Sequence, residues 1–356
     1  MSPSAILLGI LAPAAAATAV PQPGAIQTFK DWTVGCDNIG HCQAVSLVPD
    51  LAGAYDRWEG PITLVRSADQ DGALKVRVLI EVPDIDRYQM LIDGKLVDTG
   101  PINNGDYQIE IVGQDAKKVA RAIALGKELQ VVGPNSENLT RVSLAGSAAA
   151  LRYIDARQKR AGTQTALVAK GRRPFQPKSI DLPVVLVDQW DRSELIPDTG
   201  QIVALAESSA CKEDRFGLVE DQAFPMGQRG NQNLSLVLIS CGSGAYNFSS
   251  IAFIGRLETN ETGPKTWQFK PAKFDVPPGW GSFDTSSLLV NASFDPEDQT
   301  LASHAKGRGI GDCGNAEEYV WDGKMFRLIT ASAMSECRGG YDWITTWRAT
   351  FQKINP

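Results

Sequence analysis

The sequence predicts a mainly β protein with a few helices, arranged as two antiparallel β-sandwich-like or barrel-like domains. Short apolar runs alternate with polar residues along most of the chain, and Asp-Gly and Asn-Gly turn signals separate many of them. Only two segments have the spacing of amphipathic helices. The chain has 356 residues, which exceeds what one hydrophobic core usually supports, so we expect two domains.

Residues 1–19 have the features of a secretory signal peptide. The apolar run 6–11 precedes small residues, and Ala17-Thr18-Ala19 fits the small-x-small cleavage pattern, with Ala15-Ala16-Ala17 as a competing site. This run is shorter than the roughly 20 apolar residues that span a bilayer. No later segment is long and apolar enough either, so we expect an exported chain that is not transmembrane.

Residues 25–162 are expected to form the first domain, which is β-rich and carries two helices. Strand-like runs occupy residues 62–65, 74–82 and 107–112. We expect the first helix over residues 116–125, after an Asp115 cap. The second should begin at Ser143 or Ser147 and end before Gly162.

Residues 163–182 are expected to link the domains, because they are rich in Pro and Gly. The overlapping segment 152–178 has eight basic side chains and one acidic one, Asp155. The basic residues are Arg152, Arg157, Lys159, Arg160, Lys170, Arg172, Arg173 and Lys178. Two interpretations are open: a weak contact with an anionic surface of lipid or polysaccharide, or a solvated linker and helix face.

Residues 183–356 are expected to form the second domain, again β-rich. Apolar runs at residues 184–187, 202–205, 234–239, 251–254, 288–290 and 326–329 predict strands, and turn signals separate them. No long helical period is visible in this part. The pattern is typical of an antiparallel β domain.

The six cysteines predict three disulfides in an exported chain. Six cysteines allow 15 connectivities, and sequence alone does not choose among them. Local spacing favours Cys36–Cys42, Cys211–Cys241 and Cys313–Cys337. Asn38 and Gly40 suit a turn between two strands that the first pair would bridge. A metal site with His41 is the alternative, but the chain has no CxxC spacing, so we expect no metal.

Composition and motifs exclude several function classes. The net charge is −6 and the pI about 5.2, which argues against nucleic acid as a partner. The glycine-rich run 307–314 lacks both the Lys-Ser/Thr ending of a phosphate loop and the dinucleotide fingerprint, so we expect no cofactor. No G-x-S-x-G element accompanies the two histidines.

The candidate ligand-binding residues lie in two loops that the Cys313–Cys337 bridge would bring together. These are Arg308, Asp312, Glu336 and Arg338, with Trp343 as an aromatic neighbour. Guanidinium groups there could bind a carboxylate or phosphate. The alternative is two Arg–carboxylate pairs that only hold the loops together. A tryptophan in this region could stack on sugars, although tryptophan in β domains more often fills the core.

Several stretches of the sequence resemble parts of two known families. The run TFKDWTVGCDNIGHCQAVSL resembles the opening of invasion-associated locus B (IalB) proteins, which are secreted or periplasmic; the matching residues are Phe29, Asp31, Trp32, Val34, Cys36 and Cys42. The later run SLAGSAAALRYIDARQKRAGT resembles that family's closing segment. The run GRGIGDCGNAEEYVWDGKMFRLITASAMSECRGG, followed by DWITTWRA, is similar to the C-terminal signature of a two-domain proteobacterial periplasmic family of unknown function.

The second resemblance covers nearly the whole mature chain and implies periplasmic export, a β-rich body and paired cysteines. The resemblance supplies no catalytic residue, and we predict none. We expect a non-enzymatic binding or envelope-interaction protein whose partner is an envelope protein or glycan. The alternative is a hydrolase acting on envelope polymers through Asp312 or Glu336 with His304.

Overall fold

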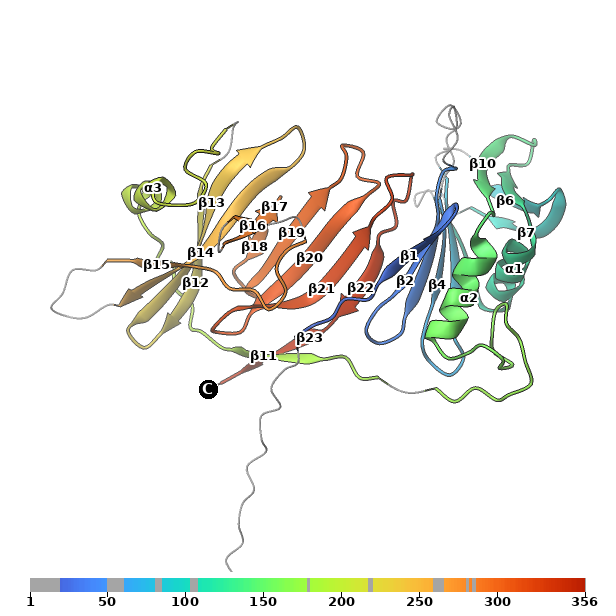
Figure 1. Ribbon diagram of the computed structural model, residues 1–356, viewed down its shortest axis with the longest axis horizontal. Coiled ribbons are helices and arrows are strands. Elements are labelled where there is room, and N and C mark those ends of the chain that lie inside the picture. The colour runs from blue at the N-terminus through green and yellow to red at the C-terminus, as the bar shows by residue number, and fades with distance from the viewer. Residues whose placement is uncertain are drawn as a thin grey trace, which may run out of the picture.

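The computed structural model describes residues 20–49, 61–80, 85–102, 108–177, 180–216, 220–258, 266–279, 282–283 and 286–355. The expected signal peptide, residues 1–19, lies outside the described residues, as does Lys178 of the basic segment. The fold is mainly β with a few helices, as predicted (Figure 1). Among the described residues, no helix has the length and apolar character needed to cross a membrane.

The N-terminal part contains two antiparallel sheets. The first has six strands: β1 (Ile26–Phe29), β2 (Trp32–Cys36), β3 (Cys42–Ser46), β4 (Ile62–Arg66), β5 (Leu74–Leu79) and β8 (Gln108–Val112), in that spatial order. The second has four, in the order β10 (Asn138–Ser143), β9 (Glu128–Val132), β6 (Arg87–Ile92) and β7 (Lys95–Pro101). Strand β5 alternates buried and half-buried side chains, which is the pattern expected of a strand with one face on a core.

Two helices complete the N-terminal core. Helix α1 (Gly113–Leu125) packs on β5, β7 and β8, while α2 (Ser147–Arg157) packs on β1, β2 and β3. The buried apolar side chains of both helices join one cluster with the sheets, and Trp32 in this cluster is fully buried. Burial of this kind is the main favourable contribution to folding.

The start of α1 and the end of α2 differ from those predicted, whereas the end of α1 at Leu125 and the start of α2 at Ser147 agree with the prediction. Asp115 lies in the first turn of α1 and does not cap it; the N-cap is Val112, which makes no side-chain cap. An acidic residue in the first turn still interacts favourably with the helix dipole. Helix α2 begins at Ser147, whose hydroxyl donates to the carbonyl of Ile123 (2.8 Å) and so joins the two helices. It stops before Lys159, which has a left-handed backbone (φ 57°).

The residues that follow α2 fold back onto the N-terminal part. The buried carboxylate of Asp155 accepts hydrogen bonds from the amides of Leu167 (2.8 Å), Val168 (2.9 Å) and Ala169 (3.1 Å). It also pairs with buried Arg66 at 2.9 Å. The start of the segment expected to be a linker is therefore bound by the preceding helix.

The C-terminal part contains three sheets. The first is a six-stranded sheet in which five strands follow the order β12 (Gln222–Arg229), β13 (Gln232–Ser243), β14 (Phe248–Glu258), β17 (Ser286–Val290) and β16 (Ser282–Phe283). The sixth strand, β15 (Gln268–Pro271), pairs with β14. A second sheet runs β18 (Ser293–Asp295), β19 (Thr300–Lys306), β20 (Gly314–Trp321), β21 (Phe326–Met334) and β22 (Ile344–Arg348). The third is a parallel pair, β11 (Val184–Asp188) with β23 (Thr350–Ile354).

One helix in this part was not predicted. The apolar run 202–205 was expected to be a strand, but it lies within α3 (Thr199–Glu207). The side chain of Asp198 accepts from the amide of Gln201 (2.9 Å), and the Gln201 side chain accepts from the amide of Asp198 (3.1 Å). This reciprocal capping box is a helix start signal that was visible in the sequence and outweighs the strand-like run.

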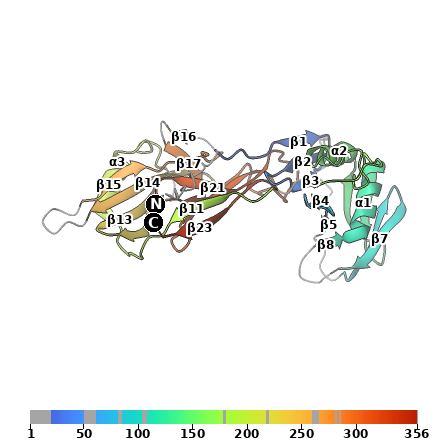
Figure 2. The same cartoon turned by 90° about the horizontal axis from the view of Figure 1, so that it is seen from below.

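The two parts form an elongated molecule, with the N-terminal sheets at one end and β12–β15 at the other (Figure 2). Strand β22 lies next to β2 and β3 where the parts meet (Figure 1). A small apolar cluster crosses this boundary and joins Val45 and Leu47 to Met334 and Ile344. The two parts therefore pack against each other through apolar side chains and are not joined by the connecting chain alone.

Candidate functional site

The structure contains three disulfides, Cys36–Cys42, Cys211–Cys241 and Cys313–Cys337. These are the local pairs that the spacing favoured. Cys36 and Cys42 face each other across the β2–β3 hairpin, so the turn at residues 37–41 closes as expected. Among the described residues, no group of three or more His, Cys, Asp or Glu side chains is arranged to hold a metal ion.

The Cys313–Cys337 disulfide does bring the two candidate loops together. Arg308 donates to both carboxylate oxygens of Asp312, at 2.7 and 2.5 Å, and the amide of Gly339 from the other loop also donates to Asp312 (2.7 Å). Burial opposes ionisation of Asp312, but the bonds from Arg308 and Gly339 outweigh it and lower the pKa of the carboxyl. Asp312 is therefore a bound structural anion.

Arg338 binds across the boundary instead of joining Asp312. Its guanidinium donates to the carbonyls of Val48 (2.8 Å) and Lys30 (3.0 Å) and to the carboxylate of Asp31 (2.6 Å). Glu336, the expected partner, has no side-chain hydrogen bond or ion pair within the described parts of the chain. The predicted cluster is thus divided into one internal pair and one anchor on the N-terminal part.

Further polar contacts show that this region is a junction. The carboxylate of Asp342 accepts from the hydroxyl of Thr63 (2.6 Å) and pairs with Arg77 (3.1 Å). Arg348 pairs with buried Asp37 (2.7 Å), close to the first disulfide. Charge-assisted bonds between parts far apart in sequence fix a relative orientation. Of the residues predicted to bind a ligand, Arg338 joins the two parts by hydrogen bonds. Ligand binding by this set of residues stays a prediction.

Trp343 and His304 occupy the same junction. Their rings meet edge to face with centroids 4.7 Å apart, and the indole N–H of Trp343 donates to the carbonyl of Gly311 (3.2 Å). Desolvation, with the positive charge of Lys306, lowers the pKa of His304. An acid–base couple of His304 with Asp312 has no support in this geometry, because both Asp312 oxygens are already hydrogen-bonded and the residue is fully buried.

The basic segment is only partly exposed. Arg160 is fully buried, its guanidinium lies 3.8 Å from the ring centroid of Phe175, and burial lowers its pKa to about 10. It therefore takes no part in a surface patch. Among the remaining described basic residues, Arg152, Arg157, Lys159, Lys170, Arg172 and Arg173 are exposed. Contact of these residues with an anionic surface stays a prediction.

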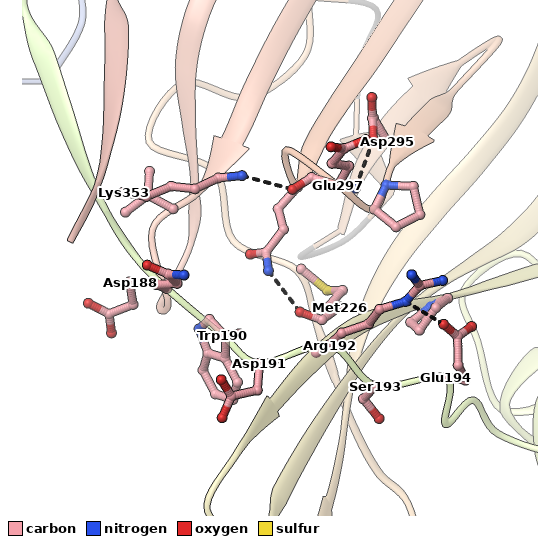
Figure 3. A pocket seen from close by; sticks show the side chains of 16 residues that line it. Asp188, Trp190, Asp191, Arg192, Ser193, Glu194, Met226, Asp295, Glu297 and Lys353 are labelled. Carbon is pink, nitrogen blue, oxygen red and sulfur yellow. Dashed lines mark hydrogen bonds and ion pairs between the residues drawn. The ribbon is translucent and has the colours of Figure 1, made fainter. Parts of the chain in front are cut away.

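A groove in the C-terminal part is a better candidate site (Figure 3). Its volume is about 710 Å³, within the range typical of ligand sites. Four segments line it: residues 187–194, which include the end of β11, the middle of β12 at 225–227, the β18–β19 turn at 295–299, and Lys353 on β23. Hereafter "the groove" means the space between these four segments.

A bulge in β12 shapes the groove. The β12–β13 register shifts between Pro225 and Gly227, and Gly227 has φ 106°. A side-chain carbon at Gly227 would lie 2.7 Å from the carbonyl oxygen of Asp191 and 2.8 Å from the Cβ of Trp190. The backbone segment that carries Trp190 can pass β12 this closely only because residue 227 is glycine.

Two polar atoms of the groove lining are buried without partners. The indole N–H of Trp190 and the side-chain carbonyl oxygen of Gln299 make no hydrogen bond among the described residues. Gln299 is 9% exposed, and its amide nitrogen is bound to the carbonyl of Met226 at 2.8 Å. Each unpaired buried group costs about 1–3 kcal/mol relative to a bonded one. Both atoms are shielded from solvent, so their missing hydrogen bonds are an internal cost of this region of the fold.

The charge of the lining is mostly negative. Its acidic residues are Asp188, Asp191, Glu194, Asp295 and Glu297, and its basic residues are Arg192 and Lys353. Both basic groups are already bound: Arg192 to Glu194 (2.8 Å), and Lys353 to the carbonyl of Glu297 (2.9 Å) and to Asp298 (3.0 Å). Figure 3 shows Asp188 and Asp191 on one side of Met226 and Asp295 and Glu297 on the other.

Sequence reasoning missed this site. Its residues come from segments up to 166 positions apart, counting from Val187 to Lys353, and none forms a recognisable motif. The one local signal was Trp190 between Asp188 and Asp191, immediately after the strand-like run 184–187. An aromatic residue among acids after a strand end is compatible with a site but also with a surface loop, so no residue pattern singled it out.

The chain is similar to proteins whose function is not described. A family model described as "Protein of unknown function (DUF1176)" matches residues 26–350. The chain is 27% identical over 342 residues to the "Uncharacterized protein YpfG" of Escherichia coli (strain K12), covering 90% of this chain and 92% of that protein. No solved structure matches.

Proposed function

We propose, for a chain that belongs to the DUF1176 family of proteins of unknown function, that it is an exported periplasmic binding protein without enzymatic activity whose ligand occupies the groove. The observation that carries the proposal is the cavity of about 710 Å³ between four segments that are distant in sequence. Binding sites for small ligands are concave and have volumes in this range.

The disulfides support the proposed compartment. Three disulfides persist where thiols are oxidised, as in the bacterial periplasm. The IalB-like opening and the signal-peptide pattern support the same location. Cell fractionation checks it: we expect the chain in the periplasmic fraction with an N terminus at residue 18 or 20. A chain in the cytosol that keeps residues 1–19 contradicts export.

Binding without catalysis is favoured by how the acids are arranged. A hydrolase that acts on glycosides needs two carboxyl groups facing each other across roughly 5–10 Å, with one held protonated. Among the groove acids, Asp188 is paired with Arg229 (3.1 Å) and Glu194 with Arg192, so each already has a basic partner. The acids that do have raised pKa values, Asp275 and Glu317, do not line the groove.

Hydrogen exchange with a ligand panel tests the proposal. Peptides of either charge and neutral and acidic glycan fragments are added one at a time to the intact chain. We expect at least one to slow amide exchange in residues 187–194 and 295–299, and to raise the melting temperature. A panel in which no member protects these segments, or a ligand that protects only the Cys313–Cys337 loops, overturns the assignment of the groove.

A further inference from the structure

We infer that the outward side of α1, together with Lys170, binds the surface of a bilayer that contains anionic phospholipid. The inference goes beyond the proposed function, because none of these residues lines the groove. Two observations carry it: basic side chains that gather on one side of the helix, and an exposed leucine among them. Hereafter "the α1 face" means Lys117, Lys118, Arg121, Leu125 and Lys170.

The helix period gathers these side chains on one side. The buried residues of α1 are Ala116, Val119, Ala120 and Ile123. Lys118, Arg121 and Leu125 are spaced three and four apart, so at 3.6 residues per turn they lie on the opposite side, and all three are exposed. Asp115 is the one acidic residue of the helix, and the same period places it on the flank away from Lys117. The outward side of α1 is therefore basic.

Lys170 adds a cation to this side of the molecule. It follows a segment that α2 holds, since the amide of Ala169 donates to the carboxylate of Asp155 (3.1 Å), and α2 contacts α1. Desolvation, together with the positive charges of Arg121 and Lys117, lowers the pKa of Lys170. The cations of the loop and of the helix therefore lie close enough to repel one another.

The basic groups of the α1 face have no acidic partner within the part of the chain that the structure describes. None of the four basic side chains takes part in a hydrogen bond or an ion pair there. The whole chain has a net charge of −6, so this local positive field is contrary to the charge of the molecule. An anionic bilayer is complementary to it, and each basic group near such a surface strengthens binding about fivefold.

The exposed leucine favours a bilayer over an acidic polysaccharide. The side chain of Leu125 is 85% exposed, more than any other large hydrophobic residue that the structure describes. An apolar side chain beside basic groups can enter the boundary between the headgroups and the acyl chains. A sulfated polysaccharide has charges for the basic groups but no apolar layer for the leucine. The contact would be peripheral, because the other side of α1 is buried in the N-terminal core.

Co-sedimentation of the intact chain with vesicles tests the inference. The probes are vesicles of phosphatidylglycerol and phosphatidylcholine in equal parts, vesicles of phosphatidylcholine alone, and dextran sulfate as a polyanion without an apolar layer. We expect the chain to bind the mixed vesicles with an affinity that falls as salt rises, since exposed charges are screened. We expect no binding to phosphatidylcholine alone.

Two kinds of variant separate charge from apolar contact. Lys118→Gln with Lys170→Gln should weaken binding to the mixed vesicles about 25-fold. The matched control, Lys270→Gln with Lys273→Gln, removes the same charge from two exposed lysines of the C-terminal part and should leave binding unchanged. Leu125→Ala should weaken vesicle binding about threefold to tenfold and leave the affinity for dextran sulfate unchanged. All five residues are exposed, so the melting temperature should stay the same.

Each result supports or overturns the inference. Absence of binding to the mixed vesicles, or equal losses in the two double variants, overturns the assignment to the α1 face. Unchanged vesicle binding in Leu125→Ala, or an equal loss of dextran sulfate binding, overturns the choice of a bilayer. The groove plays no part in these measurements, so its assignment and this inference fail separately.

Discussion

Removal of the Arg338 side chain should loosen the junction between the two parts of the molecule. The guanidinium makes three hydrogen bonds to the N-terminal part, to Val48, Lys30 and Asp31, and the side chains of Arg338 and Asp31 are only 17% and 16% exposed. Arg338→Ala deletes all three. Asp31 keeps one bond, from the hydroxyl of Ser143 at 2.7 Å.

The expected magnitude follows from these bonds. A hydrogen bond that involves a charged group contributes roughly 1.5–3 kcal/mol. Water enters the space that the side chain leaves and recovers part of the loss at the two carbonyls. We therefore expect the free energy of opening of the junction to fall by about 2–4 kcal/mol, less than the loss of three independent charged bonds.

Amide hydrogen exchange measures this opening directly, because the amide of Val48 is bonded to the carbonyl of Arg338 at 2.8 Å. A loss of about 2–4 kcal/mol raises the open population, and hence the exchange rate of Val48, roughly 30- to 700-fold. Lys212→Ala is the control, because its pair with Glu213 spans 3.7 Å with side chains 53% and 83% exposed. Less than about a threefold change in Arg338→Ala refutes the account of the junction.

Three further outcomes are expected. Asp155→Asn leaves buried Arg66 without its counterion and should lower the free energy of unfolding of the N-terminal part by about 3–5 kcal/mol, measured by calorimetry. Burial raises the pKa of Glu317 in the folded chain. The stability linked to this group is therefore complete in acid and is lost as pH rises through the folded pKa. Glu317→Gln should raise the melting temperature at neutral pH, with no gain in acid. Gly227→Ala should displace the segment carrying Trp190, which near-ultraviolet circular dichroism will show as a changed aromatic spectrum, whereas an unchanged spectrum contradicts the close approach.

Local features of the fold were predictable from the sequence because they depend on neighbouring residues. The β2–β3 hairpin follows from Asn38 and Gly40 between two apolar strands, and its strand ends place Cys36 opposite Cys42. The helix at 202–205 was missed because four apolar residues fit either a short strand or a helix. Only the Asp198–Gln201 capping box separates the two, and it lies outside the apolar run.

The site depends on contacts between distant residues, which no local pattern encodes. Arg338 was expected to cluster with Arg308, Asp312 and Glu336 beside the Cys313–Cys337 bridge, but its carboxylate partner is Asp31, 307 positions away. The groove likewise needs the β11–β23 pairing and the bulge at Gly227 to bring Trp190 beside the β18–β19 turn. Topology decides both, and alternation and turn signals do not specify topology.

A crystal structure of the chain with a ligand from the panel that raises its melting temperature tests the central claim most directly. The account predicts that the ligand lies in the groove and contacts residues 187–194 and 295–299. A ligand bound elsewhere on the molecule would contradict it.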